Sequence, residues 1–158
     1  MTFEIPKDMK FEEISPRKGR GSISSFRKTV RCGIYIWQTT NVRLNAVIGE
    51  EIASRVGITV GSYVQVQVGI SNDIVLATYK KATDPEGAYY LAKANGKREG
   101  NADVRIMATL DRHLHDIFQD VAIRLIPCEY MIQGKSIVIR IHNELLRLHD
   151  QMELPLTD

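Results

Sequence analysis

Two stretches of the chain match each other without a gap, and this match limits the folds open to it. VRLNAVIGEEIASRV at residues 42–56 aligns with VRIMATLDRHLHDIF at residues 104–118, an offset of 62 residues. The shared positions are mainly apolar and are spaced as in a strand followed by a short helix. Such a repeat indicates a core built from two similar halves. Chance similarity between two strand–helix–strand units is the alternative.

Two glycines, Gly57 and Gly61, follow the first stretch. Glu50 and Glu51 precede them at the expected start of the short helix, where acidic side chains favour the positive end of the helix dipole. Gly57 lies where a helix commonly ends in the left-handed conformation. Gly61 lies where a tight turn with positive φ leads into the next strand. The glycines therefore predict a short helix folded back between two strands.

The second copy lacks both glycines, and we expect it to be shorter. Residues 121–127 would replace residues 62–68, and residues 137–139 would replace residues 74–76. With period-two alternation in residues 30–37, the pattern predicts a mostly β (α+β) fold. We expect a flexible arm at residues 1–23 and one domain at residues 24–158. That domain would comprise halves at 29–80 and 88–142 and a C-terminal helix at 143–152.

The first half resembles a known DNA-binding family. The resemblance covers residues 42–79, with a possible second copy at 104–141, and rests on Arg43, Ile48, Ile52, Val56-Gly57-Ile58, Gly61, Val64 and Val66. These residues are similar to the AbrB-like (SpoVT-AbrB type) swapped-hairpin domain. The resemblance implies a swapped-hairpin-like pseudo-twofold barrel and a role in transcription regulation. One half-unit has too little apolar area to close a core, so two must combine, within a monomer or a homodimer.

Basic residues cluster near the N-terminus. Residues 17–31 contain no acid, although the net charge of the whole chain is only +2. Their cations are Arg17, Lys18, Arg20, Arg27, Lys28 and Arg31. A flexible basic arm binds phosphates and releases counterions. We therefore expect a small nucleic-acid-binding protein whose partner is double-stranded DNA. A solvated tail without a ligand is the alternative for the arm.

Further cations are candidates for the same role. Arg43 and Arg105 occupy equivalent places in the two copies and would lie on one strand face, where they could straddle a groove. Lys97 and Arg98 follow the Asn95-Gly96 turn and could reach phosphate from its tip. Ordinary solvent-facing arginines and a soluble turn are the alternatives.

A protein–protein interaction module is the competing function. The aromatic side chains of Tyr35 and Trp37, or the Leu-rich C-terminal helix, would then contact a protein partner. Small inhibitor or adaptor proteins of phages and mobile elements have this character. Nuclease-treated pull-down separates the two functions, because only a protein partner survives the treatment.

Catalytic and metal-binding patterns are weak in this sequence. It contains no nucleophile elbow, no phosphate-binding P-loop and no dinucleotide fingerprint, so we expect neither an enzyme nor a cofactor. His113 and His115 diverge on the expected helix, so no metal site is predicted. Cys32 and Cys128 are expected to be buried free thiols. No apolar run long enough for a membrane helix or a secretory signal is present, so the expected location is the cytoplasm.

Overall fold

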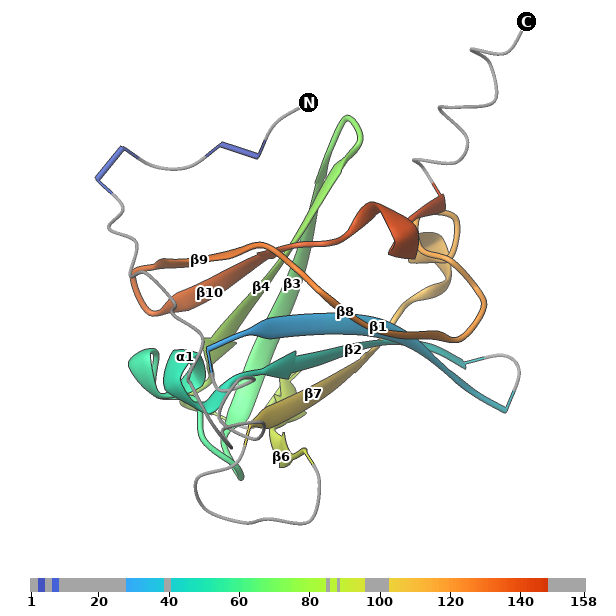
Figure 1. Ribbon diagram of the computed structural model, residues 1–158. Coiled ribbons are helices and arrows are strands. Elements are labelled where there is room, and N and C mark those ends of the chain that lie inside the picture. Colours follow the sequence, from blue (N-terminus) through green and yellow to red (C-terminus); the bar gives the residue numbers. More distant parts are fainter. Residues whose placement is uncertain are drawn as a thin grey trace, which may run out of the picture.

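The computed structural model describes residues 3–4, 7–8, 28–38, 41–84, 86–87, 89–95 and 103–147. Two antiparallel sheets contain all ten strands of these residues (Figure 1). Sheet A has the order β6-β7-β2-β1-β8, formed by Lys93–Ala94, Val104–Thr109, Asn41–Ile48, Val30–Trp37 and Ile123–Pro127. Sheet B has the order β5-β3-β4-β10-β9, formed by Tyr89–Leu91, Tyr63–Ser71, Ile74–Lys81, Ser136–Arg140 and Tyr130–Gln133. The mostly β fold is confirmed.

The two sheets enclose one hydrophobic core. Sheet A contributes Leu44 and Ile106, and sheet B contributes Tyr79 and Ile137, all of them fully buried. The buried positions alternate along β2 and β7, as the period of two in the sequence requires. The residues between the buried ones, such as Arg43 and Arg105, point to the opposite face of sheet A.

The expected closed barrel is wrong. In the described residues no strand ladder joins sheet A to sheet B, and the chain bends where it passes between them. One bend is at Ala92, between β5 and β6, where the backbone of Ala92 pairs with Ser62 and Gly61. Another is at Cys128 and Glu129, between β8 and β9, and the third passage, from β2 to β3, runs through residues 49–62. Because the strands are interrupted at these corners, the edge ladders end there instead of continuing around a barrel.

The central strand pairs place the two copies against each other. Strand β2 pairs antiparallel with β7, and Asn45 lies directly opposite Met107. Strand β4 pairs antiparallel with β10, and Ala77 lies directly opposite Ile139. Each of these opposed pairs is separated by 62 residues, the offset of the sequence repeat.

The two hairpins of sheet B also correspond at this offset. Ser71 pairs with Ile74 in the first, and Gln133 pairs with Ser136 in the second. Their turns place Asn72 at φ 57° and Gly134 at φ 63°. The expected replacement of residues 74–76 by residues 137–139 is therefore wrong by one residue, because Ile74 corresponds to Ser136.

The short helix of the first copy is confirmed as α1 (Glu50–Arg55), with Glu50 and Glu51 in its first turn. Gly57 and Gly61 have φ of 79° and 91°, as the sequence predicts. The carboxylate of Asp103 accepts a hydrogen bond of 3.0 Å from the backbone N–H of Glu50, which satisfies a free donor at the helix start. Asp103 directly precedes β7, so this bond joins the two copies.

The corresponding segment of the second copy differs from the expected helix. It contains only the 3₁₀ helix η2 (Arg112–Leu114) and then forms an isolated bridge between Phe118 and Leu146. Backbone pairing with the chain after η3 (Asn143–Leu145) replaces helical bonds at this point. The helix expected at residues 143–152 is represented by η3, and residues 148–152 lie outside the described residues. No helix of the described part is long and apolar enough to span a membrane.

Candidate nucleic-acid interface

The outer face of sheet A carries basic and aromatic side chains. Val42, Leu44 and Ala46 of β2 point into the core, so Arg43 and Asn45 between them point outward. The same alternation turns Arg105 of β7 outward. We call this surface the basic face, formed by Arg31, Tyr35, Trp37, Arg43, Lys93, Arg105 and Met107.

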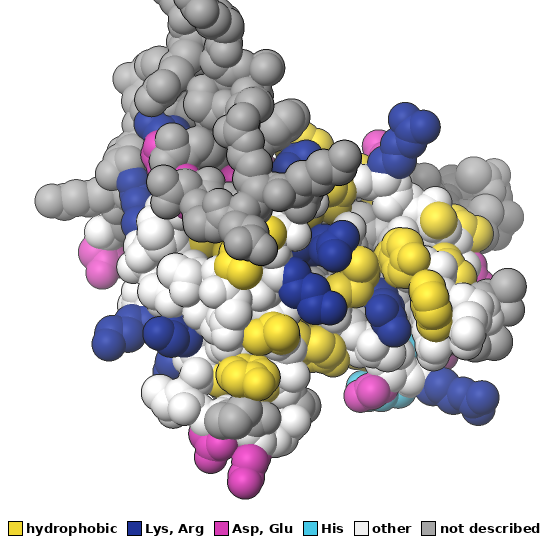
Figure 2. Space-filling model, turned by 90° about the horizontal axis from the view of Figure 1, so that it is seen from below, with side chains coloured by type: hydrophobic (Ala, Val, Ile, Leu, Met, Phe, Trp, Pro, Cys, Tyr) yellow, Lys and Arg dark blue, Asp and Glu magenta, His cyan; other side chains and the backbone are white. Residues whose placement is uncertain are grey.

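The five strands of sheet A contain Lys and Arg but neither Asp nor Glu. Within the described residues no acidic side chain forms an ion pair with Arg43, Lys93 or Arg105. Figure 2 shows this side of the molecule, with Lys and Arg side chains near its centre among hydrophobic side chains and acidic side chains toward its margins. Among the described residues, the charges of Arg43, Lys93 and Arg105 are therefore not neutralised by an ion pair.

Three of the cations lie in one row across the strands. Lys93 is directly opposite Arg105, Arg105 is opposite Val47, and Val47 is opposite Arg31. Adjacent strands are about 4.8 Å apart, so Lys93 and Arg105 are close neighbours. Like charges directly opposite one another destabilise a sheet. A polyanion bound over Lys93 and Arg105 would relieve that repulsion, whereas the buried Val47 separates Arg31 from this pair.

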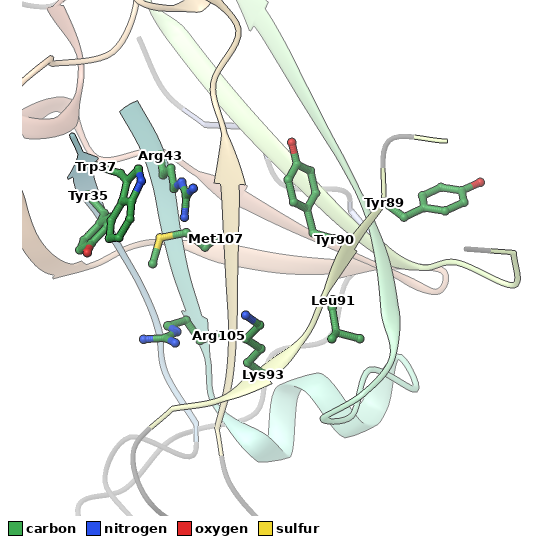
Figure 3. A pocket seen from close by; sticks show the side chains of 9 residues that line it. All are labelled: Tyr35, Trp37, Arg43, Tyr89, Tyr90, Leu91, Lys93, Arg105 and Met107. Atoms are coloured by element: carbon green, nitrogen blue, oxygen red, sulfur yellow. The ribbon is translucent and has the colours of Figure 1, made fainter. Parts of the chain in front are cut away.

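An aromatic cluster lies beside the row. Tyr35 is directly opposite Arg43, and the guanidinium carbon of Arg43 is 5.8 Å from the centre of the Trp37 ring. This distance is within the range of a cation–π interaction. Figure 3 shows Tyr35 and Trp37 next to each other, with Arg43 and Met107 beside them. The side chains of Tyr35 and Trp37 are nevertheless 39% and 44% exposed.

The aromatic cluster, Lys93 and Arg105 line one depression of about 520 Å³, and Arg31 does not. Its far wall comes from β5, where the Tyr90 hydroxyl donates a 3.3 Å hydrogen bond to the carbonyl of Thr109. Lys93 and Arg105 lie between this wall and the aromatic cluster (Figure 3). Its volume is within the range of small-molecule sites, and its lining combines aromatic surface with positive charge.

The structure brings together part of the predicted site. Arg43 and Arg105 line the same depression, on adjacent strands, and Arg31 lies on the same face. Lys28 lies 3.7 Å from the carboxylate of Glu51, so its charge is partly compensated. The remaining predicted residues lie outside the described residues: Arg17, Lys18, Arg20, Arg27, Lys97 and Arg98.

Several residues of the depression do not stand out in the sequence. Met107, Tyr89 and Tyr90 carry no motif. They reach the site because β5, the edge strand of sheet B, lies near β7, the second strand of sheet A. Tyr35 and Trp37 are expected from the sequence to contact a protein, and Arg43 to contact DNA, yet they form one cluster. Their shared position on β1 and β2 could have been found from the strict alternation of both strands.

The two cysteines meet in the core, although 96 residues separate them in sequence. Both are free thiols, with Cys32 buried and Cys128 partly exposed. A hydrogen bond from the Cys32 thiol to the Cys128 sulfur raises the pKa of Cys32, as does burial. The same hydrogen bond lowers the pKa of Cys128, aided by backbone N–H groups of His142 and Cys32. Cys128 also lines a depression of about 360 Å³ with Arg140 and His142.

This arrangement predicts unequal thiol reactivity, because the thiolate is the reactive form. Iodoacetamide at about pH 8 is expected to alkylate Cys128 and to spare Cys32 in the native protein. Peptide mapping by mass spectrometry measures both sites, and both should react in urea. Cys32→Ala removes the donor that lowers the pKa of Cys128, so it should slow alkylation of Cys128 near neutral pH. Equal rates at the two native cysteines would contradict this account.

No three His, Cys, Asp or Glu side chains of the described part gather in a way that could hold a metal ion. His113 is exposed on η2, and the His115 ring bonds to the carbonyl of Leu110 at 3.0 Å. Comparison of the chain with models of protein families, with curated proteins and with solved structures gives no match.

Proposed function

We propose that this chain is a nucleic-acid-binding protein that holds its ligand on the basic face. The observation that carries the proposal is the pair of Lys93 and Arg105, which lie directly opposite each other on strands that contain no acid. Like-charge repulsion within this pair destabilises the sheet, and bound phosphate groups would offset it. Arg43 adds a further cation beside Trp37.

The register of the sheets supports an internal duplication. We infer that the two copies are related by an approximate twofold axis, which passes between Asn45 and Met107 and between Ala77 and Ile139. Such an axis is what a swapped-hairpin arrangement within one chain would produce. It would place Arg43 and Arg105 symmetrically about the centre of the outer face. This symmetry favours a DNA-binding regulator of the AbrB-like type.

The proposal predicts a steep salt dependence of binding. Fluorescence anisotropy of labelled DNA, titrated with the full chain at rising salt, measures the slope of log K against log[salt]. Three phosphate contacts, from Arg43, Lys93 and Arg105 of the depression, give a slope of about −3, and contacts from the N-terminal arm would steepen it. Absence of binding to both duplex and single-stranded DNA at about 50 mM salt would reject the proposal.

A protein partner is the second candidate, because Tyr35, Trp37 and Leu91 expose large hydrophobic surfaces around the depression. Aromatic side chains with arginine are enriched at protein interfaces. A partner with an acidic surface would complement the cations of the basic face. Pull-down after nuclease treatment distinguishes the two candidates. A protein partner that is still recovered after the treatment, together with no binding of the chain to purified nucleic acid, favours the protein-partner function.

A further inference from the structure

We propose that the depression of the basic face binds unpaired bases of a single-stranded nucleic acid, with Trp37 and Tyr35 as its stacking platform. The inference rests on the proposed binding of nucleic acid to the basic face, and it assigns unpaired bases to the depression in place of the duplex expected from the sequence. Both rings project from β1 on the outer face, and each remains about two-fifths exposed, although the core is close by. Exposed aromatic faces on a sheet are the feature with which single-strand-binding proteins stack bases.

The cations are placed to hold the backbone of the same ligand. Arg43 lies 5.8 Å from the Trp37 ring and faces the depression, and Arg105 and Lys93 follow on the next two strands. A strand with one base against Trp37 would therefore have its phosphates within reach of three positive side chains. The strands of sheet A contain no acid that would repel these phosphates.

The geometry favours an unpaired base over a duplex. In double-stranded DNA the faces of the bases are covered by their neighbours in the stack, and only edges and phosphates are accessible. The rings of Trp37 and Tyr35 lie on the surface of a sheet and cannot enter a groove of a duplex. A bound duplex would therefore leave both rings without a base to stack on. An unpaired base presents the face that these rings can cover.

Trp37 is the only tryptophan of the chain, so its intrinsic fluorescence reports directly on the depression. Titration with an oligothymidylate and an oligouridylate of about 12 nucleotides each is expected to quench this fluorescence, whereas a duplex of the same length should not. The two oligomers distinguish DNA from RNA as the source of the unpaired bases. Anisotropy of the labelled oligomers measures affinity in parallel.

Variants separate stacking from charge. Trp37→Ala is expected to weaken single-strand binding about tenfold or more, and Tyr35→Ala to weaken it less. Tyr63→Ala is the matched control, because Tyr63 is 42% exposed but lies on β3 of sheet B. Its affinity should equal that of the unchanged protein. Circular dichroism verifies that each variant is folded.

The outcomes distinguish failure of this inference from failure of the proposed function. If duplex and single strand bind equally and Trp37→Ala binds as the unchanged protein does, the inference is overturned while nucleic-acid binding stands. If neither nucleic acid binds at low salt, both fail. Quenching by an oligomer, together with loss of affinity in Trp37→Ala but not in Tyr63→Ala, supports the inference.

Discussion

The double substitution Arg43→Glu/Arg105→Glu is expected to weaken nucleic-acid binding about 100-fold at low salt. Each charge reversal removes one phosphate contact and adds a repulsive charge, so we expect each to lower the affinity about tenfold. Both side chains line the same depression, so one bound strand would meet both changes. The slope of log K against log[salt] should also become shallower by about 2. Anisotropy titrations of labelled nucleic acid at several salt concentrations measure both effects.

A control variant with the same change in net charge is available on the other sheet. Lys80 and Lys81 are exposed at the end of β4, in sheet B. Lys80→Glu/Lys81→Glu should keep nearly the whole affinity, apart from a small loss through the long-range field. An equal loss in both double variants would mean that overall charge, and not the basic face, determines binding.

Replacing Gly33 by alanine is expected to lower the free energy of unfolding by about 3 kcal/mol. Gly33 of β1 lies opposite a bulge in β8, where the pairing register shifts between Cys32 and Ile34. A Cβ atom on Gly33 would lie 2.6 Å from the carbonyl oxygen of Ile123 and 3.0 Å from the carbonyl carbon of Arg124. Both are backbone atoms, so β8 must move away and its pairing with β1 is weakened.

Gly69 provides the control for this prediction. It lies in β3, and a Cβ atom there would have no neighbour within 4 Å. Gly69→Ala should change the free energy of unfolding by less than about 1 kcal/mol. Urea unfolding followed by Trp37 fluorescence gives the midpoint and slope for each variant. Equal midpoints for Gly33→Ala and the unchanged protein would show that β8 is not held against β1 as described.

The candidate site was predictable only as separate parts. Period-two alternation in β1 and β2 places Tyr35, Trp37 and Arg43 outward, and the repeat pairs Arg43 with Arg105. Their convergence depends on the register of β1 with β2 and of β2 with β7. A shift of one residue would turn every one of these side chains into the core. The pattern along each strand cannot supply that register between distant strands.

Local structure follows from the amino-acid sequence alone: the alternating strands, the short helix α1, and the positive φ of Gly57 and Gly61. These features depend on neighbours within a few residues, where steric limits and periodicity act directly. The arrangement of the strands in two sheets and not in a closed barrel, and the contact between Cys32 and Cys128, could be known only from the folded structure. Those outcomes depend on pairing between strands far apart in the chain. Such pairing is selected by packing of the whole core, because many registers satisfy the same alternation.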